Sequence, residues 1–331
     1  MKKPKIGIVG GSGYVGSALS NSMSECFAVK IVDRTPPRIK RSDLEYVQCE
    51  IGNYNEIKIA LSDVDLVVHT AIVQIPQINE QRSLGYEVNF LGTQSVCKVV
   101  NETPSIMGML LTGTWHVFGE QELDGTIDET FGFRPDKVED RAHLYALSKI
   151  AQEVIMRYYD RMSEKVYGTI RMGTILGQGM PSKTAANIFI SKGLKCEPLT
   201  PFRHSMYRPM LYVDIGDVCE AFKAYAKRIL SGKIDKQPND LGHVVNLFWP
   251  DPITIIELAQ MVQEAINRLT SGKIKPKIEI IDEGKPALFE AEDKQRLKVD
   301  IHRVYDLLGL GELTNPQTSI NRLVKEALAT R

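Results

Sequence analysis

The sequence lacks an excess of charge of either sign, because 41 basic residues balance 41 acidic ones among its 331 residues. No net field therefore draws the chain to nucleic acid or to an anionic membrane surface. It also lacks a C-x-x-C pair, and its five cysteines are scattered, so we expect reduced thiols in a cytoplasmic protein. No apolar run approaches about 18 residues, and the apolar stretch near the N-terminus is too short for a signal peptide. The six histidines show no metal-ligand spacing.

What the sequence does contain is a regular alternation of short apolar runs and amphipathic stretches. Strands are predicted at residues 5–9, 29–32, 46–49, 66–69, 107–112 and 166–171, and helices at 14–24, 53–62, 85–102 and 145–162. Such alternation is typical of a parallel sheet with helices on both faces. We therefore predict an α/β fold built on a doubly wound parallel (Rossmann) sheet.

A glycine-rich turn joins the first predicted strand to the first helix. Two patterns overlap there, Gly11-x-Gly13-x-x-Gly16 and Gly10-x-x-Gly13-x-x-Gly16. Glycines allow a sharp turn and a close approach of the backbone to a pyrophosphate, whose charge lies at the helix N-terminus. The turn therefore predicts a bound dinucleotide, and the sequence leaves open which glycines face the phosphates.

An acidic residue, Asp33, ends the second predicted strand, 20 residues beyond Gly13. A carboxylate at this spacing binds the adenosine ribose hydroxyls and repels a 2′-phosphate, which favours NAD over NADP. Arg34 beside it weakens that preference, because a guanidinium accommodates the extra phosphate.

The second half of the chain is less regular than the first. Helices are predicted near residue 186 and at 217–230 and 254–269, with strands at 209–213, 244–247 and 274–281. We predict an NAD-binding domain over residues 1–172, to which 210–247 return. A smaller, interleaved α/β substrate-binding region is predicted over 173–209 and 248–331.

Tyr145 and Lys149 lie four residues apart on a predicted helix, so both side chains point into one cleft. A phenol is a poor base at neutral pH, but a nearby ammonium, assisted by a bound nicotinamide cation, favours the phenolate and lowers the pKa of the phenol. Thr114 follows the fifth predicted strand, at the sheet edge where ligands bind. We expect its hydroxyl to bind the substrate oxygen that exchanges a proton with Tyr145.

These motifs together resemble the extended short-chain dehydrogenases/reductases, specifically the NAD-dependent sugar epimerase/dehydratase family, over nearly the whole chain. The resemblance implies Thr114, Tyr145 and Lys149 as the catalytic triad, NAD as the cofactor, and a homodimer built on two long helices. The residues that the resemblance and the motifs assign to the cofactor are Gly10, Gly13, Tyr14, Val15, Gly16, Asp33, Arg34, Glu50, Ile51, Thr70, Ala71, Asn89, Thr112, Tyr145 and Lys149.

Departures from the family pattern concern the substrate. Members that remove water at C6 carry Asp-Glu after the catalytic Thr, whereas this chain has Trp115-His116. Thr174 stands near the position where relatives hold a diphosphate with Asn, and Arg208 is a candidate diphosphate ligand. His116 falls where relatives place a second acid–base group, so it is either such a group or an imidazole packed under the loop.

Three functions follow from these residues. The first is an NAD-dependent epimerase of a nucleotide-linked sugar that works through a transient ketone. The second is a net dehydrogenase or ketoreductase of a sugar or other small hydroxy compound with the same triad. The third is an NAD-sensing or scaffold protein, which the intact triad argues against because a sensor needs no phenolate.

Overall fold

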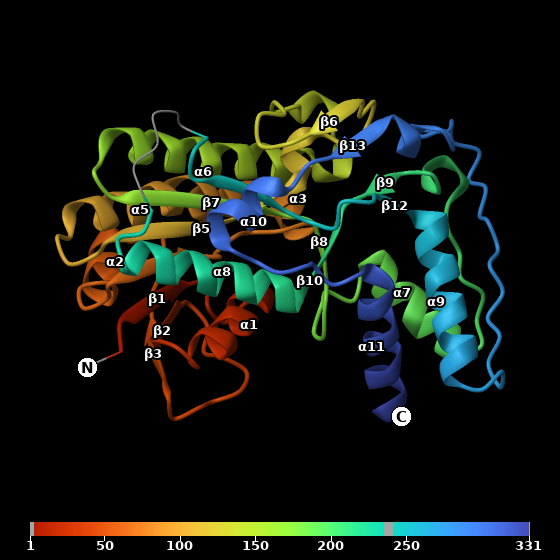
Figure 1. Ribbon diagram of the computed structural model, residues 1–331, viewed down its shortest axis with the longest axis horizontal. Helices are drawn as coiled ribbons and strands as arrows, with labels where there is room; N and C mark the ends of the chain where they lie inside the picture. The colour runs from red at the N-terminus through yellow and green to blue at the C-terminus, as the bar shows by residue number, and fades with distance from the viewer. Residues whose placement is uncertain (1–2, 235–240, 331) are drawn as a thin grey trace.

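A parallel β-sheet forms the centre of the molecule in the computed structural model, which describes residues 3–234 and 241–330. Within those ranges seven strands pair in the order β11-β7-β5-β4-β1-β2-β3, all parallel (Figure 1). The strands are β1 (Lys5–Val9), β2 (Ala28–Asp33), β3 (Leu44–Gln48), β4 (Leu66–His69), β5 (Gly108–Thr114), β7 (Val166–Met172) and β11 (Val244–Leu247). The strand order reverses between β1 and β4, which is where open parallel sheets bind their ligands.

Helices cover both faces of this sheet, as Figure 1 shows. One face packs on α1 (Tyr14–Met23) and α8 (Ile215–Leu230), and the other on α2 (Tyr54–Ala60), α5 (Thr93–Glu102) and α6 (His143–Met162). The predicted doubly wound α/β fold is confirmed. No helix in the described part of the chain is long and apolar enough to cross a membrane.

Alternating side chains on the strands explain why the sheet is buried on both faces. In β4, Leu66 and Val68 pack into the core beneath α1 and α8, whereas Val67 packs beneath α2 and α5. Ile6 and Ile8 of β1 join the first of these cores and Val9 joins the second. A strand that is apolar at successive positions is therefore stable only with helices on both sides.

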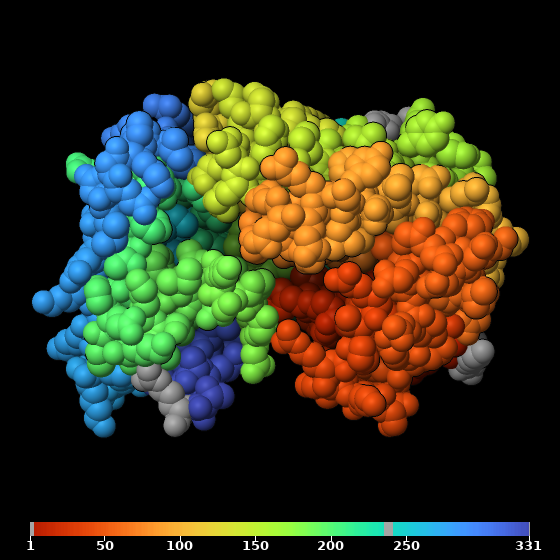
Figure 2. All heavy atoms as spheres, turned by 180° about the vertical axis from the view of Figure 1, so that it is seen from behind, coloured from red at the N-terminus to blue at the C-terminus, as the bar shows by residue number. Residues whose placement is uncertain are grey.

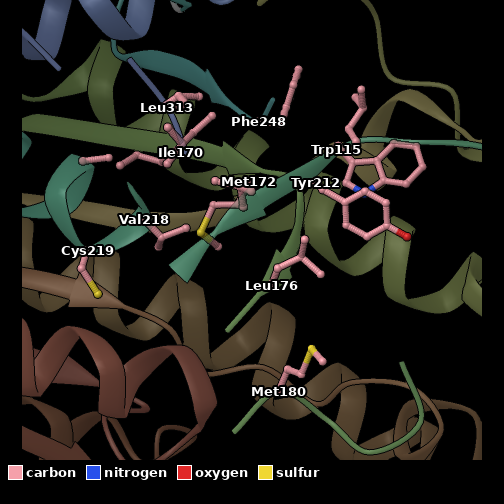
Figure 3. Packing of buried hydrophobic residues seen from close by; sticks show 14 of the residues in the cluster. Trp115, Ile170, Met172, Leu176, Met180, Tyr212, Val218, Cys219, Phe248 and Leu313 are labelled. Carbon is pink, nitrogen blue, oxygen red and sulfur yellow. The ribbon is translucent and has the colours of Figure 1, made fainter. Parts of the chain in front are cut away.

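A second lobe lies beside the C-terminal edge of the sheet. It contains α7 (Ala185–Leu194), α9 (Ile255–Leu269) and α11 (Pro316–Ala329), which pack against one another (Figure 1). Its core is continuous with that of the sheet, as Figure 3 illustrates with residues that include Met172, Leu176 and Tyr212. Short elements complete the chain: α3 (Gln77–Glu80), α4 (Arg82–Tyr86), η1 (Glu87–Gly92), η2 (Trp115–Phe118), β6 (Gly125–Ile127), η3 (Pro135–Lys137), η4 (Asp140–Ala142), β8 (Thr174–Leu176), η5 (Arg203–Ser205), β9 (Pro209–Met210), β10 (Tyr212–Asp214), β12 (Ile253–Thr254), η6 (Asp293–Arg296), β13 (Leu297–Val299) and α10 (His302–Leu308).

Three predicted elements differ from the structure. Residues 274–281 form no strand but only two isolated bridges, to Leu199 and Phe202, because the segment is largely exposed, contains Pro276 and lies at an edge. The predicted helix at 85–102 is interrupted by the π-helical segment η1. The predicted strand at 209–213 divides into β9 and β10, which pair with β12 and β8 outside the central sheet. Residues 1–2, 235–240 and 331 of the predicted domains lie outside the described residues.

Candidate active site

A cavity of about 600 Å³ opens at the carboxyl ends of β1, β4 and β5. Figure 2 shows the cleft between the red and orange N-terminal segments and the green segments of the second lobe. Most of the predicted site residues line it: Gly10, Gly13, Tyr14, Val15, Gly16, Asp33, Arg34, Glu50, Ile51, Thr70, Ala71, Thr112, Thr114, Trp115, His116, Tyr145, Lys149 and Thr174. A cavity of this size is typical of a cofactor site.

The glycine turn is as tight as a pyrophosphate site requires. Gly10 has φ +82°, and a Cβ on it would lie 2.5 Å from the backbone nitrogen of Ala71. A Cβ on Gly16 would lie 2.2 Å from the Gly10 carbonyl oxygen. Gly10, Gly13 and Gly16 line the cavity, whereas Gly11 packs against Ile31. The Gly10-x-x-Gly13-x-x-Gly16 pattern is therefore the one that faces the cavity.

Backbone and hydroxyl donors hold the carboxylate of Asp33 at the end of β2. One oxygen accepts from the Ser12 amide at 3.0 Å, and the other from the Thr35 amide at 2.9 Å and its hydroxyl at 3.1 Å. Asp33 is thereby fixed beside the glycine turn, and Arg34 lines the same end of the cavity. The donor set and the narrow turn fit the ribose and pyrophosphate of NAD.

Asn89 is not among the cavity-lining residues. It is fully buried, and its amide pairs with the backbone of Val73 at 2.7 and 3.1 Å and with the Ser148 hydroxyl at 3.0 Å. The side chain therefore ties the loop after β4 to helix α6, which carries Tyr145 and Lys149. This position favours a role in holding the loop after β4 in place rather than direct contact with the cofactor.

Tyr145 and Lys149 both point into the cavity from α6, as their spacing predicts. The Lys149 ammonium donates to the Thr112 carbonyl at 2.7 Å, and burial lowers the pKa of Lys149 to about 7. Burial raises the pKa of Tyr145 to about 12, partly offset by a hydrogen bond with Thr114. In the protein without cofactor, desolvation of the phenolate outweighs the help of its neighbours. The expected lowering of the phenol pKa includes the charge of a bound nicotinamide and therefore stays a prediction.

Replacing Lys149 is expected to stabilise the cofactor-free protein at neutral pH. Its folded-state pKa, about 7, lies below the ordinary value of 10.5, so the unfolded chain binds the proton more tightly. We compare the free energy of unfolding of the wild type with that of Lys149→Met. The wild-type value minus the variant value should therefore rise above about pH 7, by up to about 1.4 kcal/mol per pH unit. Urea unfolding from pH 6 to 9 measures this difference. The exposed Lys195→Met is the control, and a difference that is flat with pH contradicts the assignment.

The residues assigned to the substrate divide into two groups. Trp115 is fully buried and its indole donates to the Thr174 hydroxyl at 3.1 Å, so both residues form one wall of the cavity. Arg208 lies outside the cavity lining. It is buried, pairs with Glu139 and stacks on the Phe289 ring at 5.3 Å. The Glu139 carboxylate therefore faces its charge, whereas its Nε has no hydrogen-bond partner among the described residues.

His116 lies beside the catalytic groups. Its Nδ1 is 3.2 Å from the Thr114 hydroxyl oxygen and its Nε2 is 3.4 Å from Glu120 Oε1. Burial lowers the pKa of His116, and the Glu120 carboxylate opposes that shift. The ring also meets the Tyr145 ring edge to face, with centroids 5.8 Å apart. Of the two sequence alternatives, the structure therefore brings His116 into the site with both nitrogens facing polar groups.

Several residues of the site were missed by sequence reasoning. Glu120 is buried next to His116, and its only sequence signal is the His-x-x-x-Glu spacing. Further lining residues come from the loops around α3 and α7 and carry no chemical signature: Gln74, Ile75, Pro76, Gln77, Pro181 and Thr184.

Comparison with known proteins agrees with this geometry. Residues 6–239 match the NAD dependent epimerase/dehydratase family. The chain is 30% identical over 175 residues to protein y4nG of Sinorhizobium fredii, covering 52% of this chain and 41% of that protein. It is 25% identical over 205 residues to D-erythronate dehydrogenase of Haemophilus influenzae, covering 59% of this chain and 62% of that protein. These two alignments span less than two thirds of either relative.

The fold has a close counterpart among solved structures. The UDP-N-acetylglucosamine 4-epimerase of Methanobrevibacter ruminantium, solved with UDP-N-acetylmuramic acid, superposes with a TM-score of 0.78 and 16% identity over 100% of both chains. The family match extends over more than half of the chain and includes the glycine turn, Thr114, Tyr145 and Lys149. The protein is therefore an enzyme of the NAD-dependent epimerase/dehydratase family, with NAD as its cofactor.

Proposed function

We propose that this enzyme epimerises a nucleotide-linked sugar through a transient ketone. The observation that carries the proposal is the placement of the Tyr145 phenol beside Thr114 and Lys149 in the dinucleotide cavity. Bound NAD supplies a hydride acceptor that also returns the hydride. Tyr145 takes the proton of the reacting hydroxyl, Thr114 binds that oxygen, and Lys149 holds the ribose side of the site.

The epimerase cycle ends with the proton and the hydride returned to the substrate. The ketone turns over in the cavity and presents its other face, after which Tyr145 gives its proton back to the oxygen. His116 supplies a second acid–base group beside Thr114. Such a cycle shows no net redox change, so NADH does not accumulate.

A net dehydrogenase of a small hydroxy compound is the second candidate. Among the described residues that line the cavity, the cationic side chains are Arg34 near the adenosine end and Lys149 at the catalytic end. Arg208, the predicted diphosphate ligand, pairs with Glu139 instead. The similarity to D-erythronate dehydrogenase points the same way. A substrate without a diphosphate needs no further cation.

One experiment separates the two candidates. Thermal unfolding of the NAD-loaded protein is recorded with a panel of UDP-, GDP-, CDP- and dTDP-sugars and with D-erythronate, since a ligand of the folded state raises the melting temperature. Compounds that bind are then incubated with the enzyme and NAD. A new sugar stereoisomer without NADH supports the epimerase, whereas NADH formed in proportion to product supports the dehydrogenase.

We also propose that the enzyme forms a homodimer through α6. Leu147, Val154 and Tyr158 share one exposed face of this helix, with 37%, 48% and 68% of their surfaces exposed. Leu91 of η1 adds a further exposed apolar side chain. An apolar helix face of this kind is typical of a subunit interface. Tyr158→Arg should then give a monomer in analytical ultracentrifugation.

A further inference from the structure

A buried acidic residue lies next to the catalytic groups without a role in the proposed reaction. Glu120 follows η2 and is 1% exposed. Among the described residues its Oε1 atom has no hydrogen-bond partner, although His116 Nε2 is 3.4 Å away and an Arg141 nitrogen 3.7 Å away. A buried carboxylate is costly unless a positive charge or a donor faces it. The other oxygen, Oε2, accepts a hydrogen bond from the Glu139 amide at 3.4 Å, so Oε1 is the atom that faces His116.

The nearby arginines are held by a different carboxylate. Arg208 pairs with Glu139, and the Nε of Arg141 donates to Glu139 at 2.8 Å. The Arg141 side chain is 51% exposed, so water screens its charge. Glu139 is the carboxylate in closest contact with both cations, whereas Glu120 faces the imidazole at 3.4 Å and also opposes the lowering of the Arg208 pKa by burial.

The second imidazole nitrogen, Nδ1, faces Thr114 and through it the Tyr145 phenol. His116 Nδ1 lies 3.2 Å from the Thr114 hydroxyl, which is hydrogen-bonded to Tyr145. With Nε2–H aimed at Glu120, the neutral ring has its lone pair at Nδ1 and accepts from Thr114. Tyr145, Thr114 and His116 then form one continuous series along which a proton can pass, and Glu120 lies at its end as the counter-charge of the imidazole.

We propose that the His116–Glu120 pair receives, through Thr114, the proton that Tyr145 releases when it becomes a phenolate. The O–H bond of Tyr145 breaks and its proton forms a new O–H bond at Thr114, whose own proton moves to Nδ1 of His116. The products are a phenolate and an imidazolium beside the Glu120 carboxylate, so atoms and charge balance without another reactant. This inference rests on the proposed function of Tyr145 as the acid–base group.

The surroundings of His116 make this transfer demanding and explain why Glu120 is needed. Burial lowers the pKa of the imidazole, Glu120 raises it, and Arg141 and Arg208 lower it further. Tyr145 faces the ring from α6. Within residues 3–234 and 241–330, Glu120 is the one carboxylate in direct contact with the ring, and we assign it as a positioning residue that acts through His116.

A substrate-free measurement tests the pair itself. Two-dimensional NMR of the NAD-loaded, ¹⁵N-histidine-labelled protein reports the tautomer and the pKa of His116. In Glu120→Gln, which keeps the shape of the side chain, the acid dissociation constant of His116 should rise at least about tenfold, one pKa unit. Glu122→Gln, an exposed neighbour, is the matched control and should leave the constant unchanged. An unchanged His116 pKa in Glu120→Gln overturns the proposal.

A kinetic measurement tests the transfer, with UDP-glucose and UDP-N-acetylglucosamine as probes. Glu120→Gln should lower kcat about 10- to 100-fold at neutral pH with little change in KM. The wild-type kcat should fall at acid pH as His116 is protonated. His116→Asn, which keeps an acceptor near Thr114 but cannot be protonated, should lose this acid limb and gain rate toward alkaline pH.

The two proposals fail in different ways. If the wild type turns over a probe and both variants keep its kcat and pH profile, the relay is wrong and the proposed function stands. If the wild type turns over neither probe, the function with these sugars is wrong, and the NMR titration alone decides the relay. If Glu120→Gln does not fold, the pH profile of His116→Asn tests the proposal in its place, and an acid limb that this variant retains overturns the proposal.

Discussion

Tyr145→Phe is expected to abolish turnover almost completely while NAD still binds. The substitution removes one oxygen from the cavity lining and leaves the ring in place, so the cavity keeps its shape. Acid–base catalysis contributes about 10²- to 10⁴-fold to a rate, which is about 3–5 kcal/mol of the activation barrier. The loss should appear in kcat and in kcat/KM equally, because the phenol acts at the transition state.

Three measurements isolate this effect. Steady-state kinetics with the sugar that binds best gives kcat and KM, fluorescence titration gives the affinity for NAD, and circular dichroism confirms the fold. Tyr305→Phe on α10, which does not line the cavity, is the control for the loss of a phenol oxygen. Retention of full activity by Tyr145→Phe would remove the chemical basis of the proposed function.

The sheet and the cofactor site could be predicted because their signals are local. Each central strand is a short run of mostly apolar residues, as in the Leu66–His69 strand, so it can be recognised from its own sequence. The turn after the first strand can be recognised in the same way from its glycines. Tyr145 and Lys149 meet because four residues make about one helical turn. The glycine pattern left two alternatives, and the cavity lining, which includes Gly10 but not Gly11, distinguished them.

The charges of the site could not be predicted, because they depend on burial and on residues distant in sequence. The sequence places an ammonium near a phenol and suggests a lowered phenol pKa. In the folded protein both groups are desolvated, so the pKa of Tyr145 rises and that of Lys149 falls. Arg208 appears free for a phosphate until Glu139, 69 residues earlier in the chain, is found beside it.

The C-terminal segment illustrates a different limit. Residues 274–281 alternate apolar and charged side chains, which predicts a half-buried strand. In the structure the segment around residues 199–202 pairs with them only through two isolated bridges, Leu199 with Ile278 and Phe202 with Ile281. A strand needs a neighbour with an unpaired edge over its whole length, and the sequence of one segment does not reveal whether that neighbour exists.

Gly16→Ala is expected to disrupt NAD binding severely. The added Cβ would lie 2.2 Å from the Gly10 carbonyl oxygen, 2.7 Å from Gly11 Cα and 2.9 Å from the Gly10 carbonyl carbon. All three are backbone atoms, so no side chain can rotate away. The N-terminus of α1 must move away from the turn, and the amides that face the pyrophosphate move with it.

The size of this effect follows from the cost of overpacking. Forcing an extra methyl group into a packed contact costs about 1–3 kcal/mol, and a loss of this size in binding free energy weakens affinity about 5- to 150-fold. Isothermal titration with NAD and thermal unfolding of the cofactor-free protein measure the two consequences separately. Gly52→Ala is the control, since no atom lies within 4 Å of its added Cβ. If Gly16→Ala bound NAD as tightly as Gly52→Ala, the turn would not be the pyrophosphate site, and the cofactor would have to enter the cavity in another orientation.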